Sequence, residues 1–249
     1  MIKFKPLIIG HRGAMGSAPE NTAFSFEKAL KCGADGVEFD IHMTKDSHLI
    51  VIHDEKLDRT TDGKGLINEH TLEELKQVNA ARKYSGKVKT QEILTLEETL
   101  DLVGGSKIIN IEIKNGPIFY PEIEEKALDV IKNYNIVEKV IISSFNHYTI
   151  KKIKTLAPDV KCGIIYMAGL YQPWKYAKTV GAGAVHPFHL SITEELITDC
   201  QKNDIKVNLF GVNKEEMLAR AIKANVDMII TDFPDTAVRL RDKLKDKIN

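Results

Sequence analysis

Short apolar runs alternate with longer amphipathic segments along most of the chain. Runs that are apolar at nearly every position are typical of strands buried on both faces of a parallel sheet. Segments with apolar residues three and four positions apart are typical of helices that cover such a sheet. The expected strands are residues 7–10, 37–43, 108–113, 140–144, 163–167, 184–186, 207–210 and 228–231. The expected helices are residues 22–31, 95–103, 122–134, 148–156, 174–180, 194–202, 214–224 and 235–247.

Eight strands, each followed by a helix, predict a closed (β/α)8 TIM barrel of class α/β. The chain has 249 residues, which suits one barrel of this kind. We therefore expect residues 1–249 to form a single barrel domain. An open, doubly wound sheet is the structural alternative that the alternation alone leaves in place.

One segment interrupts the alternation after the second strand. Residues 49–52 predict a hairpin partner for that strand, and the chain is then polar from about residue 54 to residue 92. This stretch contains the turn sequence Asp62-Gly63-Lys64-Gly65 and one short helix, whose start is marked by a Thr71…Glu74 capping box. We expect a small insertion on the rim of the barrel.

Composition and charge narrow the classes of function. The chain is 43% hydrophobic, and 35 Lys and Arg residues balance 35 Asp and Glu residues, so its net charge favours neither nucleic acid nor an anionic membrane. No apolar stretch approaches the length of a membrane span, and the N-terminal apolar run is too short for a signal peptide. These features predict a cytoplasmic protein with a small-molecule substrate, and they leave the oligomeric state open.

Three carboxylates occur on the second and third expected strands. Glu38 and Asp40 alternate with apolar residues and so share one face of their strand, and Glu112 is placed near the end of the next. Three like charges directed at one interior require compensation, and a hard divalent cation that prefers oxygen ligands, Mg²⁺ or Ca²⁺, supplies it. Salt bridges at the barrel mouth are the alternative interpretation.

Four further residues at strand ends indicate phosphate chemistry. Arg12 suggests an anionic substrate, because guanidinium binds phosphate in bidentate geometry, and Lys114 adds a second positive charge. His11 and His53 titrate near neutrality and are suited to exchange protons on the two sides of a phosphorus centre. His186 also ends a strand, where it either lines the pocket or is structural.

Five short motifs carry a family resemblance. The sequences GHRG and PENT near the N-terminus, VEFDIHMTKD and VIHD in the second unit, and IEIK in the third resemble the glycerophosphodiester phosphodiesterase family. The resemblance extends over essentially the whole chain, including the insertion after His53, the segment Ser143-Ser144-Phe145 and the closing Thr231-Asp232-Phe233-Pro234.

The resemblance implies a metal-dependent barrel that hydrolyses glycerophosphodiesters to sn-glycerol 3-phosphate and an alcohol. It also implies an intramolecular first step, in which the neighbouring glycerol hydroxyl attacks phosphorus and water then opens a cyclic phosphate. The implied roles are metal ligands for Glu38, Asp40 and Glu112, general acid and base for His11 and His53, and phosphate binding for Arg12 and Lys114. Which histidine is the base, which of Mg²⁺ and Ca²⁺ binds, and which alcohol leaves stay open.

The chain departs from the family at one point. Family members often carry a Trp-Thr pair at the end of the seventh strand, where this chain has Phe210-Gly211, so Phe210 is expected in an altered substrate pocket. Trp174 is interpreted as a helix packing residue and not as a replacement wall. Two other functions are alternatives: a lipid-directed phosphodiesterase of phospholipase C or D type, and a non-catalytic barrel that binds a phosphate ligand.

Overall fold

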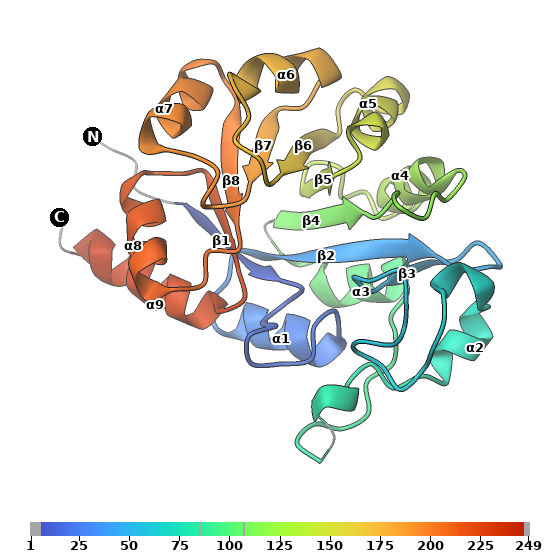
Figure 1. Ribbon diagram of the computed structural model, residues 1–249. Helices are drawn as coiled ribbons and strands as arrows, with labels where there is room; N and C mark the ends of the chain where they lie inside the picture. The colour runs from blue at the N-terminus through green and yellow to red at the C-terminus, as the bar shows by residue number, and fades with distance from the viewer. Residues whose placement is uncertain (1–5, 85, 107, 247–249) are drawn as a thin grey trace.

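Eight parallel strands form a closed barrel at the centre of the molecule. The computed structural model describes residues 6–84, 86–106 and 108–246, and Figure 1 shows the strands surrounded by helices. The barrel strands are β1 (Leu7–His11), β2 (Gly36–Met43), β4 (Ile108–Ile113), β5 (Val140–Ser144), β6 (Lys161–Tyr166), β7 (Ala184–Pro187), β8 (Lys206–Phe210) and β9 (Met228–Thr231).

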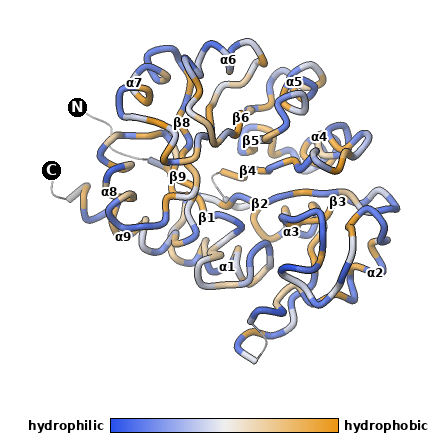
Figure 2. Tube along the Cα trace, viewed as in Figure 1, coloured by the Kyte–Doolittle hydropathy of each residue, from blue (hydrophilic) through white to orange (hydrophobic). Residues whose placement is uncertain are grey.

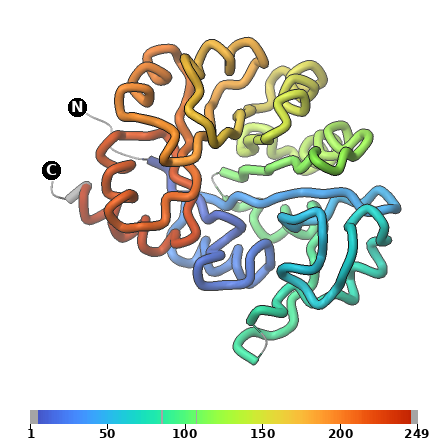
Figure 3. The backbone as a smooth tube through the Cα atoms, in the orientation of Figure 1, coloured from blue at the N-terminus to red at the C-terminus, as the bar shows by residue number. Residues whose placement is uncertain are grey.

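The barrel closes because its first strand pairs with two neighbours. β1 is parallel to β2 on one side and to β9 on the other, and the remaining strands follow one another in chain order. Figure 3 shows the chain running once around the ring, so that α9 returns beside β1. This closure confirms the predicted (β/α)8 barrel and excludes the open sheet. The short strand β3 (Leu49–Val51) is antiparallel to β2, as the expected hairpin requires.

The helices begin close to where their capping residues predict. Thr22 accepts a hydrogen bond from Ser25 N at the start of α1, and complete capping boxes at Thr71 and Thr95 open α2 and α3. Predicted helix boundaries agree within two residues, except that the predicted end of the last helix, Lys247, lies outside the described residues. The helices are α1 (Ala23–Lys31), α2 (Leu72–Lys76), α3 (Leu96–Val103), α4 (Ile123–Asn133), α5 (His147–Leu156), α6 (Pro173–Val180), α7 (Glu194–Lys202), α8 (Glu215–Lys223) and α9 (Pro234–Asp246).

Alternation along the strands divides the core into two regions. Ile109, Ile111 and Ile113 of β4 belong to the large cluster packed against the helices, whereas Asn110 and Glu112 alternate with them. A second cluster consists of strand residues inside the barrel, including Ile9, Ile141 and Met228. Figure 2 shows apolar residues concentrated along the strands, with hydrophilic positions alternating along the surrounding helices. Toward the C-terminal ends of the strands the barrel interior also holds polar side chains, among them Asn110 and Glu112.

His186 occupies space that a glycine leaves inside the barrel. A methyl group on Gly163 of β6 would overlap the His186 ring, so glycine is required here by close approach. The amide of Asn208 lies 2.8 Å from His186 Nε2, which places the ring proton on Nδ1, and Nδ1 has no hydrogen-bond partner among the described residues. Burial lowers the pKa of His186 to about 3, so the imidazole is neutral in the folded protein.

The neutral His186 is expected to make the protein labile to acid. Below pH 6.5 the unfolded imidazole binds a proton that the folded one refuses until about pH 3, so unfolding becomes easier as the pH falls through this window. At pH 5 this linkage amounts to about 2 kcal/mol. The free energy of unfolding is measured in urea at pH 7 and at pH 5. Between these two values it should fall by about 2 kcal/mol less in His186→Gln than in wild type. The exposed control His48→Gln should show the same fall as wild type. Equal losses in all three proteins would exclude this role.

Among the described residues, a small apolar cluster joins the insertion to β3 and to the residues that flank the insertion. Seven buried residues form it: Ile50, Ile52, Leu57, Ile67, Leu75, Ala80 and Ile93. Figure 1 shows α2 and the turns around it projecting at one side of the barrel. None of the described helices is long and apolar enough to cross a membrane.

Candidate active site

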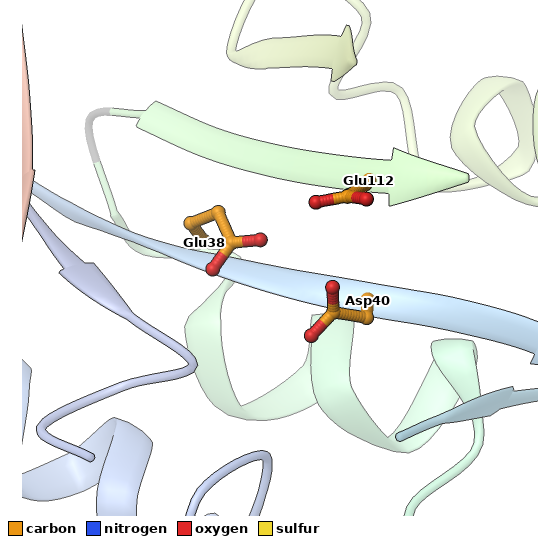
Figure 4. Close-up of side chains that lie close together, drawn as sticks. All are labelled: Glu38, Asp40 and Glu112. Atoms are coloured by element: carbon orange, nitrogen blue, oxygen red, sulfur yellow. The ribbon is translucent and has the colours of Figure 1, made fainter. Parts of the chain in front are cut away.

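Three buried carboxylates converge at the C-terminal end of the barrel strands. Glu38 and Asp40 come from β2, and the β2–β4 register sets Asp40 beside Glu112. One oxygen of each residue lies within 4.8 Å of the others, and the side chains point toward one another in Figure 4. Glu38 is 3%, Asp40 0% and Glu112 8% exposed. We call this group the carboxylate cup.

Two cations and one amide surround the Asp40 carboxylate. Lys114 Nζ lies 3.0 Å from Asp40 Oδ1 and also contacts Glu112, while Arg12 Nε lies 3.4 Å from Asp40 Oδ2. Asn21 Nδ2 donates to Asp40 Oδ2 at 2.9 Å. Burial raises the pKa of the Asp40 carboxyl, but Lys114 and Arg12 outweigh this and hold the pKa well below its usual range.

The pKa of Glu38 is shifted in the opposite direction to that of Asp40. Burial and the neighbouring Asp40 charge raise the pKa of the Glu38 carboxyl above its usual range. The cup therefore contains more negative charge than its own cations neutralise. Three crowded carboxylates facing two cations fit a hard divalent cation that prefers oxygen ligands. The residues that line the site include no cysteine, whose thiolate favours softer metals.

The backbone at Arg12 is part of the same site. Arg12 has a φ of 50°, in the left-handed region that non-glycine residues seldom occupy. This conformation lets its N–H donate to Glu38 Oε2 at 3.0 Å. Its carbonyl accepts from Asn21 N at 3.0 Å and from Ser25 Oγ at 2.9 Å, which holds the turn in place. The strained residue thus links the loop after β1 to the cup.

His11 is oriented by a carboxylate that follows the last strand. Its Nδ1 lies 2.6 Å from Asp232 Oδ1, and its Nε2 lies 4.0 Å from Glu38 Oε2. Asn213 in turn donates to Asp232 Oδ2 at 2.7 Å and accepts from the Asp232 N–H at 3.0 Å. Burial lowers the pKa of His11, but Asp232 and Glu38 more than offset this and the net pKa is raised. The ring therefore presents Nε2 to the cup.

His53 is held in the same way by its neighbour in sequence. His53 Nδ1 lies 2.6 Å from Asp54 Oδ1, and Arg59 of the insertion binds Asp54 and Glu20 with its guanidinium. Glu20 also accepts from Arg12 Nη1 at 2.7 Å, so an unbroken chain of ion pairs joins His53 to Arg12. Burial and the nearby cations, only partly opposed by Asp40, lower the pKa of His53.

A buried imidazole also supports the backbone of His53. His42 Nε2 lies 2.9 Å from the His53 carbonyl, so it is the donor, and Nδ1 then accepts from the Tyr120 hydroxyl at 2.9 Å. Burial lowers the pKa of His42 to about 4, and the ring stays neutral at physiological pH. Through these two hydrogen bonds, His42 of β2 connects the backbone at His53 to Tyr120 in the loop after β4.

The two histidines and most of the charged residues of the site line one cavity of about 230 Å³. Its walls include His11, Arg12, Glu38, His53, Glu112, Lys114, His186 and Phe210, which are eight of the nine site residues expected from the sequence. The ninth, Asp40, belongs to the cup but is not among the residues that line the cavity. Trp174 lies elsewhere and packs against the helix-facing core, as predicted.

Sequence reasoning assigned no role to the residues that orient the two histidines. Asp54 directly follows His53, and Asp232 directly follows the last expected strand. These positions in the motifs could have indicated that the two aspartates belong to the site. Arg59 and Asn213 gave no such signal. Arg59 is 39 positions from Glu20, and Asn213 is 19 positions from Asp232, so these contacts depend on how separate loops pack together.

Fold and site together define a (β/α)8-barrel enzyme whose active site combines a carboxylate cup with two carboxylate-bound histidines. The sequence profile of the glycerophosphoryl diester phosphodiesterase family matches residues 11–236. The chain belongs to this family and is a glycerophosphodiester phosphodiesterase.

Similar proteins support this assignment along the full chain. A glycerophosphodiester phosphodiesterase of Caldanaerobacter subterraneus subsp. tengcongensis is 47% identical over 95% of this chain and 98% of its own. A Bacillus altitudinis protein of the same name is 40% identical over 96% and 99%. The crystal structure of an Oleispira antarctica phosphodiesterase in complex with the product sn-glycerol-3-phosphate is 27% identical, with a TM-score of 0.87 over 96% of this chain and 98% of its own.

Proposed function

We propose that the enzyme hydrolyses glycerophosphodiesters to sn-glycerol 3-phosphate and an alcohol, with one divalent cation held by Glu38, Asp40 and Glu112. The supporting observation is the carboxylate cup, whose three oxygens lie within 4.8 Å of one another. Two oriented histidines line the same cavity as Glu38 and Glu112. A bound cation would neutralise charge on the phosphoryl oxygens. Residues 1–249 are proposed to act as one catalytic domain, with the insertion at about residues 54–92 contributing Arg59 to the rim.

The proposed reaction uses the two histidines on opposite sides of phosphorus. In the first step the neighbouring glycerol hydroxyl attacks phosphorus, one histidine accepts its proton, and the other protonates the departing alkoxide. In the second step water opens the resulting cyclic phosphate while the histidines exchange roles. Because the nucleophile belongs to the substrate, its placement contributes up to about 7–11 kcal/mol to lowering the barrier. Arg12 and Lys114 are proposed to bind the phosphoryl oxygens.

The proposed substrates are deacylated phospholipids such as glycerophosphocholine and glycerophosphoethanolamine. Phosphate chemistry is favoured by two cations beside the cup, and glycerol fits a cavity of about 230 Å³ that has polar groups at its floor. Phe210 and His186 are proposed to form part of the glycerol pocket. In the described part of the insertion, helix α2 has the sequence LEELK and buries Leu75, so it offers no broad apolar face to a membrane, which counts against the phospholipase-type alternative.

Metal removal tests the proposal directly. Treatment with a chelator followed by desalting is expected to abolish hydrolysis of glycerophosphocholine, because the cup then repels a phosphodiester. Adding Mg²⁺ or Ca²⁺ should restore the activity, and the same additions should raise the melting temperature, since an ion that binds only the folded protein stabilises it. Undiminished activity after verified metal removal would contradict the proposed cofactor while leaving the family assignment intact.

A further inference from the structure

A second, larger hollow adjoins the catalytic cavity. It has a volume of about 890 Å³ and lies between the loop after β4 and the first turn of α5. Glu112, Lys114 and Phe145 line both spaces, so the hollow opens directly beside the carboxylate cup. We call it the β4–α5 groove. Neither the family resemblance nor the proposed roles account for it.

The two spaces match the two arms of a phosphodiester. The floor of the catalytic cavity offers two buried polar atoms without partners among the described residues, Asn110 Oδ1 and His186 Nδ1. An acceptor and a donor of this kind suit the hydroxyls of glycerol. With phosphorus at the cup and glycerol on this floor, the other ester arm must leave past Lys114, and the β4–α5 groove begins there.

The charges of the groove favour a cation. Its two lysines are already neutralised: Lys114 by the cup, and Lys152 by Glu124 at 3.1 Å and Glu125 at 2.7 Å. Glu122 is exposed, and within the described part of the chain it makes no ion pair or side-chain hydrogen bond. The Glu122 carboxylate is thus the charge on the groove wall that no lysine of the groove neutralises.

The aromatic side chains of the groove agree with this preference. Phe119 and Tyr148 line it with 71% and 88% of their surface exposed, and Phe145 stands where the groove meets the cavity. Exposed aromatic faces next to an unpaired carboxylate are suited to ammonium groups, through attraction of the cation to the ring face. A neutral polyol carries no positive charge, so it gains little binding free energy from the same surface.

We propose that the β4–α5 groove binds the leaving alcohol and selects alcohols that carry an ammonium group over neutral polyols. This inference rests on the proposed function, because it assumes that phosphorus is bound at the cup. Phe119, Tyr148 and Glu122 are the specificity-determining residues, and none of them lines the catalytic cavity.

The test compares two substrates that differ only in the leaving alcohol. With metal supplied, kcat/KM is measured for glycerophosphocholine and for glycerophosphoglycerol in wild type, Phe119→Ala, Tyr148→Ala and Glu122→Gln. Each variant is expected to lower the ratio of choline ester to glycerol ester by about 3- to 30-fold. Tyr148→Phe, which keeps the ring, should restore most of the ratio. Choline should inhibit glycerophosphoglycerol hydrolysis by wild type and inhibit Tyr148→Ala less.

Tyr171→Ala is the matched control, because Tyr171 is 86% exposed but does not line the groove. It should keep the wild-type ratio. The inference is overturned if wild type hydrolyses both esters and the groove variants change both rates equally or neither. If wild type hydrolyses neither ester with Mg²⁺ or Ca²⁺ present, the proposed function itself is wrong, and the inference fails with it.

Discussion

His11→Ala and His53→Ala should each lower kcat for glycerophosphocholine by about 10²- to 10⁴-fold, the usual contribution of a general acid or base. Each imidazole has its Nδ1 bound to a carboxylate at 2.6 Å, which leaves Nε2 available to the substrate. The proposed mechanism needs both rings in each turnover, so neither single variant should retain much activity. Steady-state kinetics with saturating Mg²⁺ or Ca²⁺ measures the loss.

Two kinds of control separate chemistry from folding damage. His48→Ala removes a histidine whose side chain is about half exposed and lies outside the cavity, so its kcat should match wild type. Asp54→Asn and Asp232→Asn keep the histidines but weaken their orientation, and kcat should fall by less than in the alanine variants. Full activity of a folded His11→Ala or His53→Ala protein would show that the histidine concerned neither accepts nor donates the transferred proton.

Asp40→Asn should lower the free energy of unfolding of the metal-free protein by about 3–5 kcal/mol, the cost of removing one partner from a buried charge pair. Asp40 is fully buried between Arg12 and Lys114, and these two cations lose their shared counter-charge in the variant. The pKa of Asp40, held far below its usual range, reflects the same stabilisation. Urea unfolding after chelation at pH 7 is the measurement.

Glu38→Gln makes the same change in charge at the adjacent inward position of β2 and should have the opposite effect. The pKa of Glu38 is raised by burial and by Asp40, so its ionised form destabilises the metal-free fold, and the glutamine variant should be as stable as wild type or more stable. Both variants should lose the stabilisation that Mg²⁺ or Ca²⁺ gives wild type. Equal destabilisation by the two substitutions would contradict this account of the cup.

The barrel fold and the positions of the candidate site residues could be predicted from local sequence patterns. Apolar runs and capping residues predicted the strands and the starts of most helices, because these features depend on neighbours within a few positions. The carboxylates and histidines stood at strand ends, and parallel strands in a barrel deliver their ends to one face. Eight of the nine expected residues therefore line one cavity, and the ninth lies in the cup.

Relations between distant side chains could not be derived in this way. Asp232 reaches His11 across 221 positions of sequence. Arg59 reaches Glu20 from an insertion in which local motifs predicted one turn and one short helix but not how these pack against the barrel. Gly163 and His186 complement each other in shape only because β6 and β7 lie side by side.

The sequence by itself determined the (β/α)8 order of elements and the kinds of side chain at the mouth of the barrel, since both follow from local periodicity and strand direction. Only the tertiary structure decided which carboxylate carries the cations, which partner orients each histidine, and where the β4–α5 groove opens. Those properties depend on distances of a few ångströms between separate loops, and barrel closure is what brings the loops together.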